Sequence, residues 1–136
     1  MSFSLNEVHM TLRKALCGRG LAYGVADEFG AVGARLSSGE TCDGVQAVLA
    51  LNNDALIARL HHIEAALAGA DQHALADPLD ARLVEQLTGA PFPRARACAI
   101  SEASWEQALA LSHLTYVPES ESSRLGGAGA GTNDND

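Results

Sequence analysis

The apolar residues of this chain recur at intervals of three or four positions, which is the spacing of an α-helix. The clearest run is Leu56, Leu60, Ile63 and Leu67, and this spacing places all four side chains on one helical face. Alanine and leucine together occupy 43 of the 136 positions, whereas aromatic residues make up only 4% of the chain. Alanine and leucine favour helices, and aromatic residues favour strands. The sequence therefore predicts an all-α fold.

Start and stop residues divide the chain into about five to six short helices, which we expect to pack as a compact bundle. Ser4-Leu5-Asn6-Glu7 has the form of a capping box, in which Ser4 and Glu7 satisfy each other's backbone amides. The capping residues expected for the later helices are Asp43, Asp54, Asp77 and Ser101. The glycines expected at helix ends are Gly18, Gly20, Gly69 and Gly89. The predicted helices cover residues 4–18, 21–36, 43–51, 54–69, 77–89 and 101–114.

The second predicted helix carries a strip of small residues beside its apolar stripe. The strip consists of Ala22, Ala26, Gly30 and Gly33. A glycine inside a helix costs about 1 kcal/mol relative to alanine, so each one needs a packing reason. We interpret the strip as a surface that another backbone approaches closely.

One segment near residues 94–100 reads as extended rather than helical. It follows Ala90-Pro91-Phe92-Pro93, which cannot continue a helix, and its residues alternate as those of a strand do. No strand partner for it is evident. We expect a single helical domain over residues 1–118 and a Gly-rich acidic arm over residues 119–136, whose composition is typical of a disordered segment.

The charge of the chain argues against nucleic acid as a partner. Seventeen acidic residues against nine basic ones give a formal net charge of −8. Proteins that bind nucleic acid obtain most of their affinity from a basic surface that neutralises phosphates. No basic run is present here, so we expect no nucleic-acid partner.

Cysteine usage and hydropathy predict a cytoplasmic location. Cys17, Cys42 and Cys98 are odd in number and form no CxxC pair, which is typical of a reducing compartment. The first ten residues lack the basic patch and apolar run of a signal peptide. No stretch reaches the roughly 20 apolar residues of a membrane-spanning helix. We therefore expect no membrane partner.

Two candidate chemical sites have weak support. His61, Glu64 and His73 suggest a metal site, but zinc sites usually take three or four ligands, and surface histidines explain the pattern more simply. Cys98 is the best placed nucleophile because Arg94 and Arg96 share its side of the extended segment. A small buried thiol explains it equally simply. We expect no metal and no cofactor, and metal binding ranks third among the candidate functions.

Short stretches near both ends of the chain are recognisable. They are Ser4-Leu5-Asn6-Glu7-Val8, then Thr115-Tyr116-Val117-Pro118-Glu119-Ser120, and the run Gly127-Ala128-Gly129-Ala130-Gly131. Together they resemble a small bacterial family of unknown function. The resemblance supplies no catalytic residues, but it implies that the arm is functional. The residues that we expect to bind a partner or ligand are Tyr116, Glu119, Ser120, Ser123, Arg124, Gly127, Gly129 and Gly131.

Two functional hypotheses follow. The first is a non-catalytic interaction or accessory protein, which docks through the small-residue strip and presents the arm to a protein partner or to a second copy in a homo-oligomer. The alternative is an enzyme or enzyme subunit for a small polar metabolite. In that case the arm closes over a pocket, and Tyr116, Ser123 or Arg124 orients the substrate.

Overall fold

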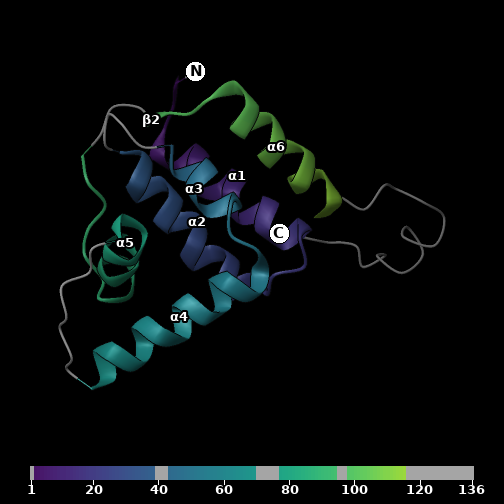
Figure 1. The fold of residues 1–136 in the computed structure, drawn as a ribbon. Helices are drawn as coiled ribbons and strands as arrows, with labels where there is room; N and C mark the ends of the chain where they lie inside the picture. The colour runs from purple at the N-terminus through teal and green to yellow at the C-terminus, as the bar shows by residue number, and fades with distance from the viewer. Residues whose placement is uncertain (1, 39–42, 70–76, 95–97, 116–136) are drawn as a thin grey trace, which may run out of the picture.

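Helices α1 (Leu5–Gly18) and α2 (Tyr23–Ser37) form the centre of the fold, and the remaining elements pack around them (Figure 1). The computed structural model describes residues 2–38, 43–69, 77–94 and 98–115. Within these ranges the other elements are β1 (Ser2–Phe3), α3 (Gly44–Leu49), α4 (Asn53–Ala68), α5 (Pro78–Leu87), β2 (Cys98–Ala99), α6 (Glu102–Ser112) and the 3₁₀-helix η1 (His113–Thr115). The expected all-α bundle of five to six short helices is confirmed.

Most of the predicted helix starts are correct. The capping box of α1 is formed, because the Glu7 amide donates to Ser4 Oγ at 3.1 Å and the Ser4 amide donates to Glu7 Oε1 at 3.0 Å. Asp43, Asp77 and Ser101 also cap their helices as predicted. The cap of α4 is different: Asn52 accepts from the Ala55 amide at 2.8 Å, and Asp54 lies inside the first turn. Both residue types are good caps, so composition alone did not distinguish them.

Two of the predicted stop glycines end their helices in the same way. Gly20 has φ +93° and Gly89 has φ +77°, a conformation that favours glycine. After α1, the Leu21 amide donates to the Leu16 carbonyl at 3.0 Å. After α5, the Ala90 amide donates to the Glu85 carbonyl at 2.9 Å. These bonds are those of the Schellman motif, which satisfies carbonyls at a helix end.

Neighbouring backbones approach the small-residue strip of α2 closely. A Cβ placed on Gly30 would lie 2.8 Å from the His9 carbonyl oxygen of α1. Gly33 faces Leu12 of α1 and Gly44 of α3, and a Cβ on Gly44 would lie 2.0 Å from the Gly33 oxygen. The interpretation as a close-packing surface is therefore correct. Ala26, Gly30 and Gly33 are buried against these neighbours and present no docking surface, whereas Ala22 is exposed just before α2.

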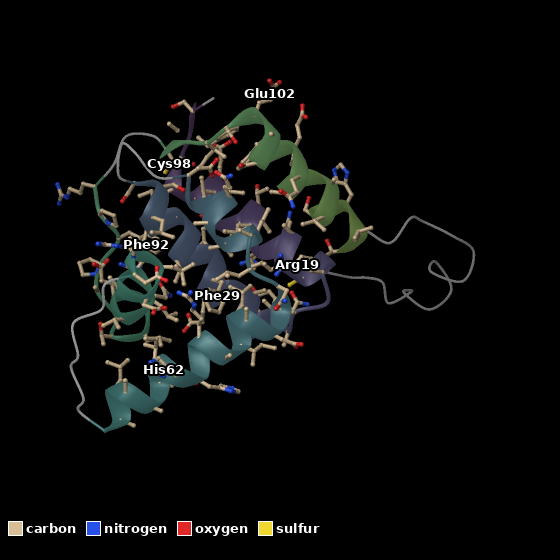
Figure 2. The ribbon with its side chains drawn as sticks, viewed as in Figure 1. Arg19, Phe29, His62, Phe92, Cys98 and Glu102 are labelled. Carbon is tan, nitrogen blue, oxygen red and sulfur yellow. The ribbon has the colours of Figure 1, made fainter. Side chains whose placement is uncertain are left out.

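The core lies where α1 and α2 meet α3, α4, α5 and α6, and it is almost entirely aliphatic. Phe29 of α2 is fully buried at its centre (Figure 2). The predicted stripes supply most of the remaining core: Val8, Leu12, Leu16, Val32, Val45, Val48, Leu56, Leu60, Ile63, Leu79, Leu83 and Ala108 are all buried. The helices therefore form where the spacing of apolar residues predicts them.

The extended segment has a strand partner that the sequence pattern did not reveal. Cys98–Ala99 pairs antiparallel with Ser2–Phe3, and Phe3 lies opposite Cys98. Phe3 also stacks on Trp105 of α6, with ring centroids 3.8 Å apart and planes at 17°. The partner strand, Ser2–Phe3, is only two residues long and shows no alternation of its own, so the pairing could not be predicted. Residues 95–97 lie outside the described ranges.

Arg19 joins the end of α1 to the turn between α3 and α4 (Figure 2). Its guanidinium donates to the carbonyls of Leu49 and Leu51, at 3.1 and 2.7 Å, and to Asn53 Oδ1 at 3.0 Å. The side-chain amide of Asn53 donates in return to the Arg19 carbonyl at 2.9 Å.

Of the helices that the structure describes, none combines the length and apolarity needed to cross a membrane.

Asp43 connects two helix starts. Its Oδ1 accepts from the Gln46 amide at 3.0 Å, and its Oδ2 accepts from the Ser101 amide at 3.1 Å. Burial alone raises the pKa of this carboxyl. Hydrogen bonds from the Gln46 and Ser101 amides and from the Ser104 and Ser101 hydroxyls outweigh that effect and hold the pKa below its ordinary value. The ionised form of Asp43 therefore holds α3 against α6.

The Gly33–Gly44 contact predicts a large effect of a single methyl group. We expect Gly44→Ala to destabilise the protein by about 1–3 kcal/mol, because the new Cβ meets a backbone oxygen that cannot rotate away. Gly24→Ala is the matched control, since nothing lies within 4 Å of its Cβ position. It is expected to be neutral or stabilising by up to about 1 kcal/mol. Urea unfolding measures both, and equal stability of the two variants would contradict the close approach.

The Asp43 contacts predict a pH-dependent contribution to stability. A carboxyl whose pKa is lower in the folded state stabilises the fold above its unfolded pKa of about 3.9, and this contribution is lost as pH decreases through the folded pKa. We expect Asp43→Asn to lower the free energy of unfolding by about 1 kcal/mol at pH 7. The difference from wild type should vanish at strongly acidic pH. Asp54→Asn, at an exposed position, is the control. If the loss of unfolding free energy in Asp43→Asn stays constant with pH, the ionised carboxylate of Asp43 does not stabilise the fold.

Candidate functional site

A row of aromatic and charged side chains lies along the seam between α1 and α2. We call His9, Arg13, Tyr23, Asp27 and Phe92 the α1–α2 surface. His9 and Arg13 are four residues apart on α1, and Tyr23 and Asp27 are four residues apart on α2, so each pair shares one helical face. Phe92 reaches the row from the loop after α5.

The members of this row contact one another in sequence. Arg13 lies over the Tyr23 ring, with its guanidinium carbon 5.1 Å from the ring centroid, and its Nη1 is 3.6 Å from Asp27 Oδ1. His9 Nε2 lies 3.0 Å from the same Asp27 oxygen. The His9 and Phe92 rings are 6.1 Å apart at 30°. The close approach of the helices at Gly30 places these side chains opposite each other.

Two of the aromatic side chains in this row are exposed. The chain contains only six residues of the types Phe, Trp and Tyr. Tyr23 is 62% exposed and Phe92 is 40% exposed, although Phe3, Phe29 and Trp105 pack inside the fold. An exposed aromatic pair beside an arginine is a surface feature that buries favourably against another molecule.

A pocket of about 200 Å³ lies at one end of the row. Its walls are Leu5, Asn6, His9 and Phe92. Leu5, Asn6 and His9 are at helical spacing on α1, so the pocket lies on the first two turns of that helix. The Nε2 and Cδ2 edge of His9 faces α2, where Asp27 and Gly30 lie. The opposite edge of the ring, which carries Nδ1, points away from α2.

Arg35 holds Phe92 in place from inside the protein. The side chain of Arg35 is only 3% exposed. Its guanidinium donates to the Ala90 carbonyl at 2.5 Å, to the Pro91 carbonyl at 3.3 Å and to Gln86 Oε1 at 3.0 Å. The guanidinium also lies 4.5 Å from the centroid of the Phe92 ring. Arg35 therefore fixes both the loop backbone and the ring that it carries.

The charge of Arg35 is balanced locally. Burial lowers its pKa, and the Glu85 carboxylate, with Oε1 3.7 Å from Nη1, raises it in part. The carbonyls at the end of α5 also carry the negative pole of the helix dipole, which favours a cation there. Sequence analysis missed Arg35 because its position lies on the predicted helix beside Leu36 and no pattern marks a buried arginine.

A second pocket, of about 270 Å³, lies between α2, α3, α4 and α5. Leu36, Ala47, Leu51 and Leu79 provide its apolar walls, and Arg59, Asp77 and Pro78 complete it. Arg59 forms ion pairs with Asp77 and with Asp80, the latter at 3.0 Å. The hydrogen bond from Arg59 is the main reason that the pKa of Asp77 is lowered. Arg59 and its carboxylates thereby hold the start of α5 against α4.

The structure does not describe the site residues predicted from sequence. Tyr116, Glu119, Ser120, Ser123, Arg124, Gly127, Gly129 and Gly131 lie outside the described ranges, as do Cys42 and His73. His61 and Glu64 are described and are exposed on α4. Neighbouring His62 also lies on that helix (Figure 2). Over residues 2–38, 43–69, 77–94 and 98–115, no three His, Cys, Asp or Glu side chains gather to hold a metal ion.

Cys98 is a core residue rather than an accessible thiol. It is fully buried in β2, and burial raises the pKa of its thiol, which disfavours the reactive thiolate. Arg96 lies outside the described ranges. The nucleophile interpretation of Cys98 therefore has no support, and the alternative, a small buried hydrophobic residue, fits its surroundings.

The Arg35 contacts predict a strong dependence of stability on this one cation. We expect Arg35→Met to destabilise the protein by about 3 kcal/mol, because three partly buried acceptors lose their donor and Glu85 loses its buried cationic partner. Arg82→Met is the control, since Arg82 pairs with Glu85 at the surface, and it should cost less than about 1 kcal/mol. Chemical unfolding compares the two variants. Similar losses would show that Arg35 contributes no more than a surface ion pair.

Comparison with known proteins adds no further constraint on the site. No protein-family model matches the sequence, and no curated protein and no solved structure is significantly similar to it. The resemblance of the chain ends to a small bacterial family therefore stays a prediction.

Proposed function

We propose that this protein is a non-catalytic interaction or accessory subunit that binds another polypeptide, either a separate protein or a second copy of itself. The observation that carries the proposal is the α1–α2 surface, where Tyr23 and Phe92 are exposed on either side of Arg13, Asp27 and His9. In this proposal the surface is one contact element and the arm of residues 119–136 is a second.

The chemistry of the surface favours a polypeptide over a nucleic acid or a metal. Tyrosine and arginine are enriched among the residues that carry most of the binding energy in protein interfaces. Tyr23 and Arg13 already lie in a fixed geometry, so little conformational entropy is lost when a partner covers them. The net charge of −8 supports a protein partner over a polyanion.

A second candidate function, an enzyme or enzyme subunit for a small polar metabolite, is favoured by one specific observation. His9 and Asp27 form the type of pair in which a carboxylate orients an imidazole, and they adjoin the pocket of Leu5, Asn6 and Phe92. Its volume of about 200 Å³ is below the ~300–1,000 Å³ of typical small-molecule sites. We therefore rank this candidate second.

Removing the arm separates these candidates. We expect light scattering to give a mass above the chain mass of 14.1 kDa for the full-length protein, and a lower mass for a chain ending at Pro118. The truncated chain keeps all the described helices, so circular dichroism and thermal unfolding should match those of the full-length protein. An enzyme whose arm closes a pocket would instead keep its assembly and lose ligand binding. If both chains are monomers of equal stability, the arm is not an assembly element.

A further inference from the structure

The pocket at the end of the α1–α2 surface is apolar and has room for one side chain. Its volume of about 200 Å³ is below the ~300–1,000 Å³ of typical small-molecule sites. The surface that Leu5, Asn6, His9 and Phe92 present to it is almost wholly apolar. A ring or a branched aliphatic chain gains hydrophobic contacts there, whereas a polar group finds few hydrogen-bond partners. The pocket therefore favours an aliphatic or phenylalanine side chain.

The walls of the pocket are fixed before anything binds. Three of them lie on the first two turns of α1, where the capping box is formed. Phe92 belongs to the loop after α5 (Figure 2), and the Arg35 guanidinium holds it in place. Arg35 also donates to the carbonyls of Ala90 and Pro91 in that loop. A preformed pocket loses little conformational entropy on binding, so a single anchor side chain contributes measurable affinity.

An exposed cation lies close to this pocket. Arg94 is exposed and only two residues after Phe92, which is at most about 7 Å along the chain. Pro93, between them, has a fixed φ and restricts the residue before it, so the backbone that carries Arg94 has little freedom relative to Phe92. None of the ion pairs formed among the described residues involves Arg94.

The carboxylates of the α1–α2 surface and of the first turn of α1 are engaged elsewhere. Asp27 contacts both His9 and Arg13. Glu7 accepts from the Ser4 amide in the capping box, and it lies about 160° around α1 from His9 at the helical spacing of about 100° per residue. The cation beside the pocket is therefore not neutralised, although the chain as a whole has a net charge of −8.

We propose that the pocket of Leu5, Asn6, His9 and Phe92 binds an apolar side chain of a separate polypeptide, and that an acidic side chain of the same segment pairs with Arg94. In an extended segment, alternate side chains lie on one face about 7 Å apart, which matches the two-residue spacing of Phe92 and Arg94. The recognised motif is a leucine, isoleucine or phenylalanine with an aspartate or glutamate two residues away. This inference rests on the proposed function and names the chemistry of its partner.

Three short peptides test the motif by nuclear magnetic resonance of the full-length protein. We expect acetyl-Leu-Ala-Glu-amide to shift the backbone amide resonances of residues 5–9, 92 and 94, with a dissociation constant in the millimolar range. Acetyl-Ser-Ala-Glu-amide should bind at least about tenfold more weakly, because it lacks the apolar anchor. Acetyl-Leu-Ala-Gln-amide should bind about two- to fivefold more weakly, because an exposed ion pair is lost.

Two charge variants locate the ion pair. Arg94→Gln should remove the difference in affinity between the Glu and Gln peptides and leave the affinity for the Gln peptide unchanged. Lys14→Gln is the matched control, since Lys14 is exposed on the opposite face of α1 from Leu5, and the difference should persist. Phe92→Ser, which removes a pocket wall, should abolish binding of all three peptides. Circular dichroism checks that each variant is folded.

The outcomes separate this inference from the proposed function. Unshifted pocket resonances, or equal affinity for the Leu and Ser peptides, overturn the anchor site. Equal affinity for the Glu and Gln peptides overturns the acidic partner. If a chain ending at Pro118 binds the peptide more tightly than the full-length protein does, the arm of residues 119–136 occupies the pocket. If the pocket resonances move with protein concentration, a second copy occupies it. Either result overturns a separate partner.

The proposed function has its own test, which is the assembly of the full-length and truncated chains. A failed peptide titration leaves an interaction protein that assembles through another surface. A monomeric protein that binds the Leu-Ala-Glu peptide as expected supports this inference and the separate-partner form of the proposed function, and it overturns the self-assembling form.

Discussion

The close approach of α1 and α2 determines the rest of the structure. Gly30 allows the α1 backbone to reach α2, and Gly33 leaves room for Leu12 of α1 and for the α3 backbone at Gly44. A side chain at either position would push the helices apart. Because the helices are this close, His9 and Arg13 meet Asp27 and Tyr23 directly. The candidate binding surface therefore depends on two residues that are not part of it.

Two arginines, partly buried Arg19 and buried Arg35, complete the fold by binding loop carbonyls. Arg19 donates to carbonyls between α3 and α4, and Arg35 donates to carbonyls after α5. In each case the cation satisfies carbonyls at or shortly after the end of a helix, and the helix dipole favours a positive charge nearby. Burial of a charge without partners destabilises a protein, but each guanidinium donates hydrogen bonds to several acceptors. The loops that they hold, including the one that carries Phe92, are fixed by these contacts.

Capping residues and apolar spacing act over a few residues, so they predicted the helices. Contacts between residues far apart in the sequence could not be predicted in this way. The capping box at Ser4 and Glu7 acts within four residues, so the sequence pattern alone predicts it. His9 and Asp27 are 18 residues apart, and neither belongs to a motif, so only the packing of two helices brings them together. Arg35 and Phe92 are also far apart in the sequence, and only the packing of the fold brings them into contact. Sequence reasoning instead chose the arm, on the strength of a predicted family resemblance, and its residues lie outside the described ranges.

The pairing of β1 with β2 joins the start of the described chain to the segment that precedes α6. Its contacts span almost a hundred residues, whereas α1 and α2 are neighbours in sequence, so closing it costs more chain entropy than forming the helical pair. Trp105, the single tryptophan of the protein, stacks on Phe3 beside this pairing. The fluorescence of Trp105 therefore reports when β1 packs against β2 and α6, whereas far-ultraviolet circular dichroism reports the formation of the helices. The two spectroscopic signals thus follow the least local and the most local contacts of the same molecule.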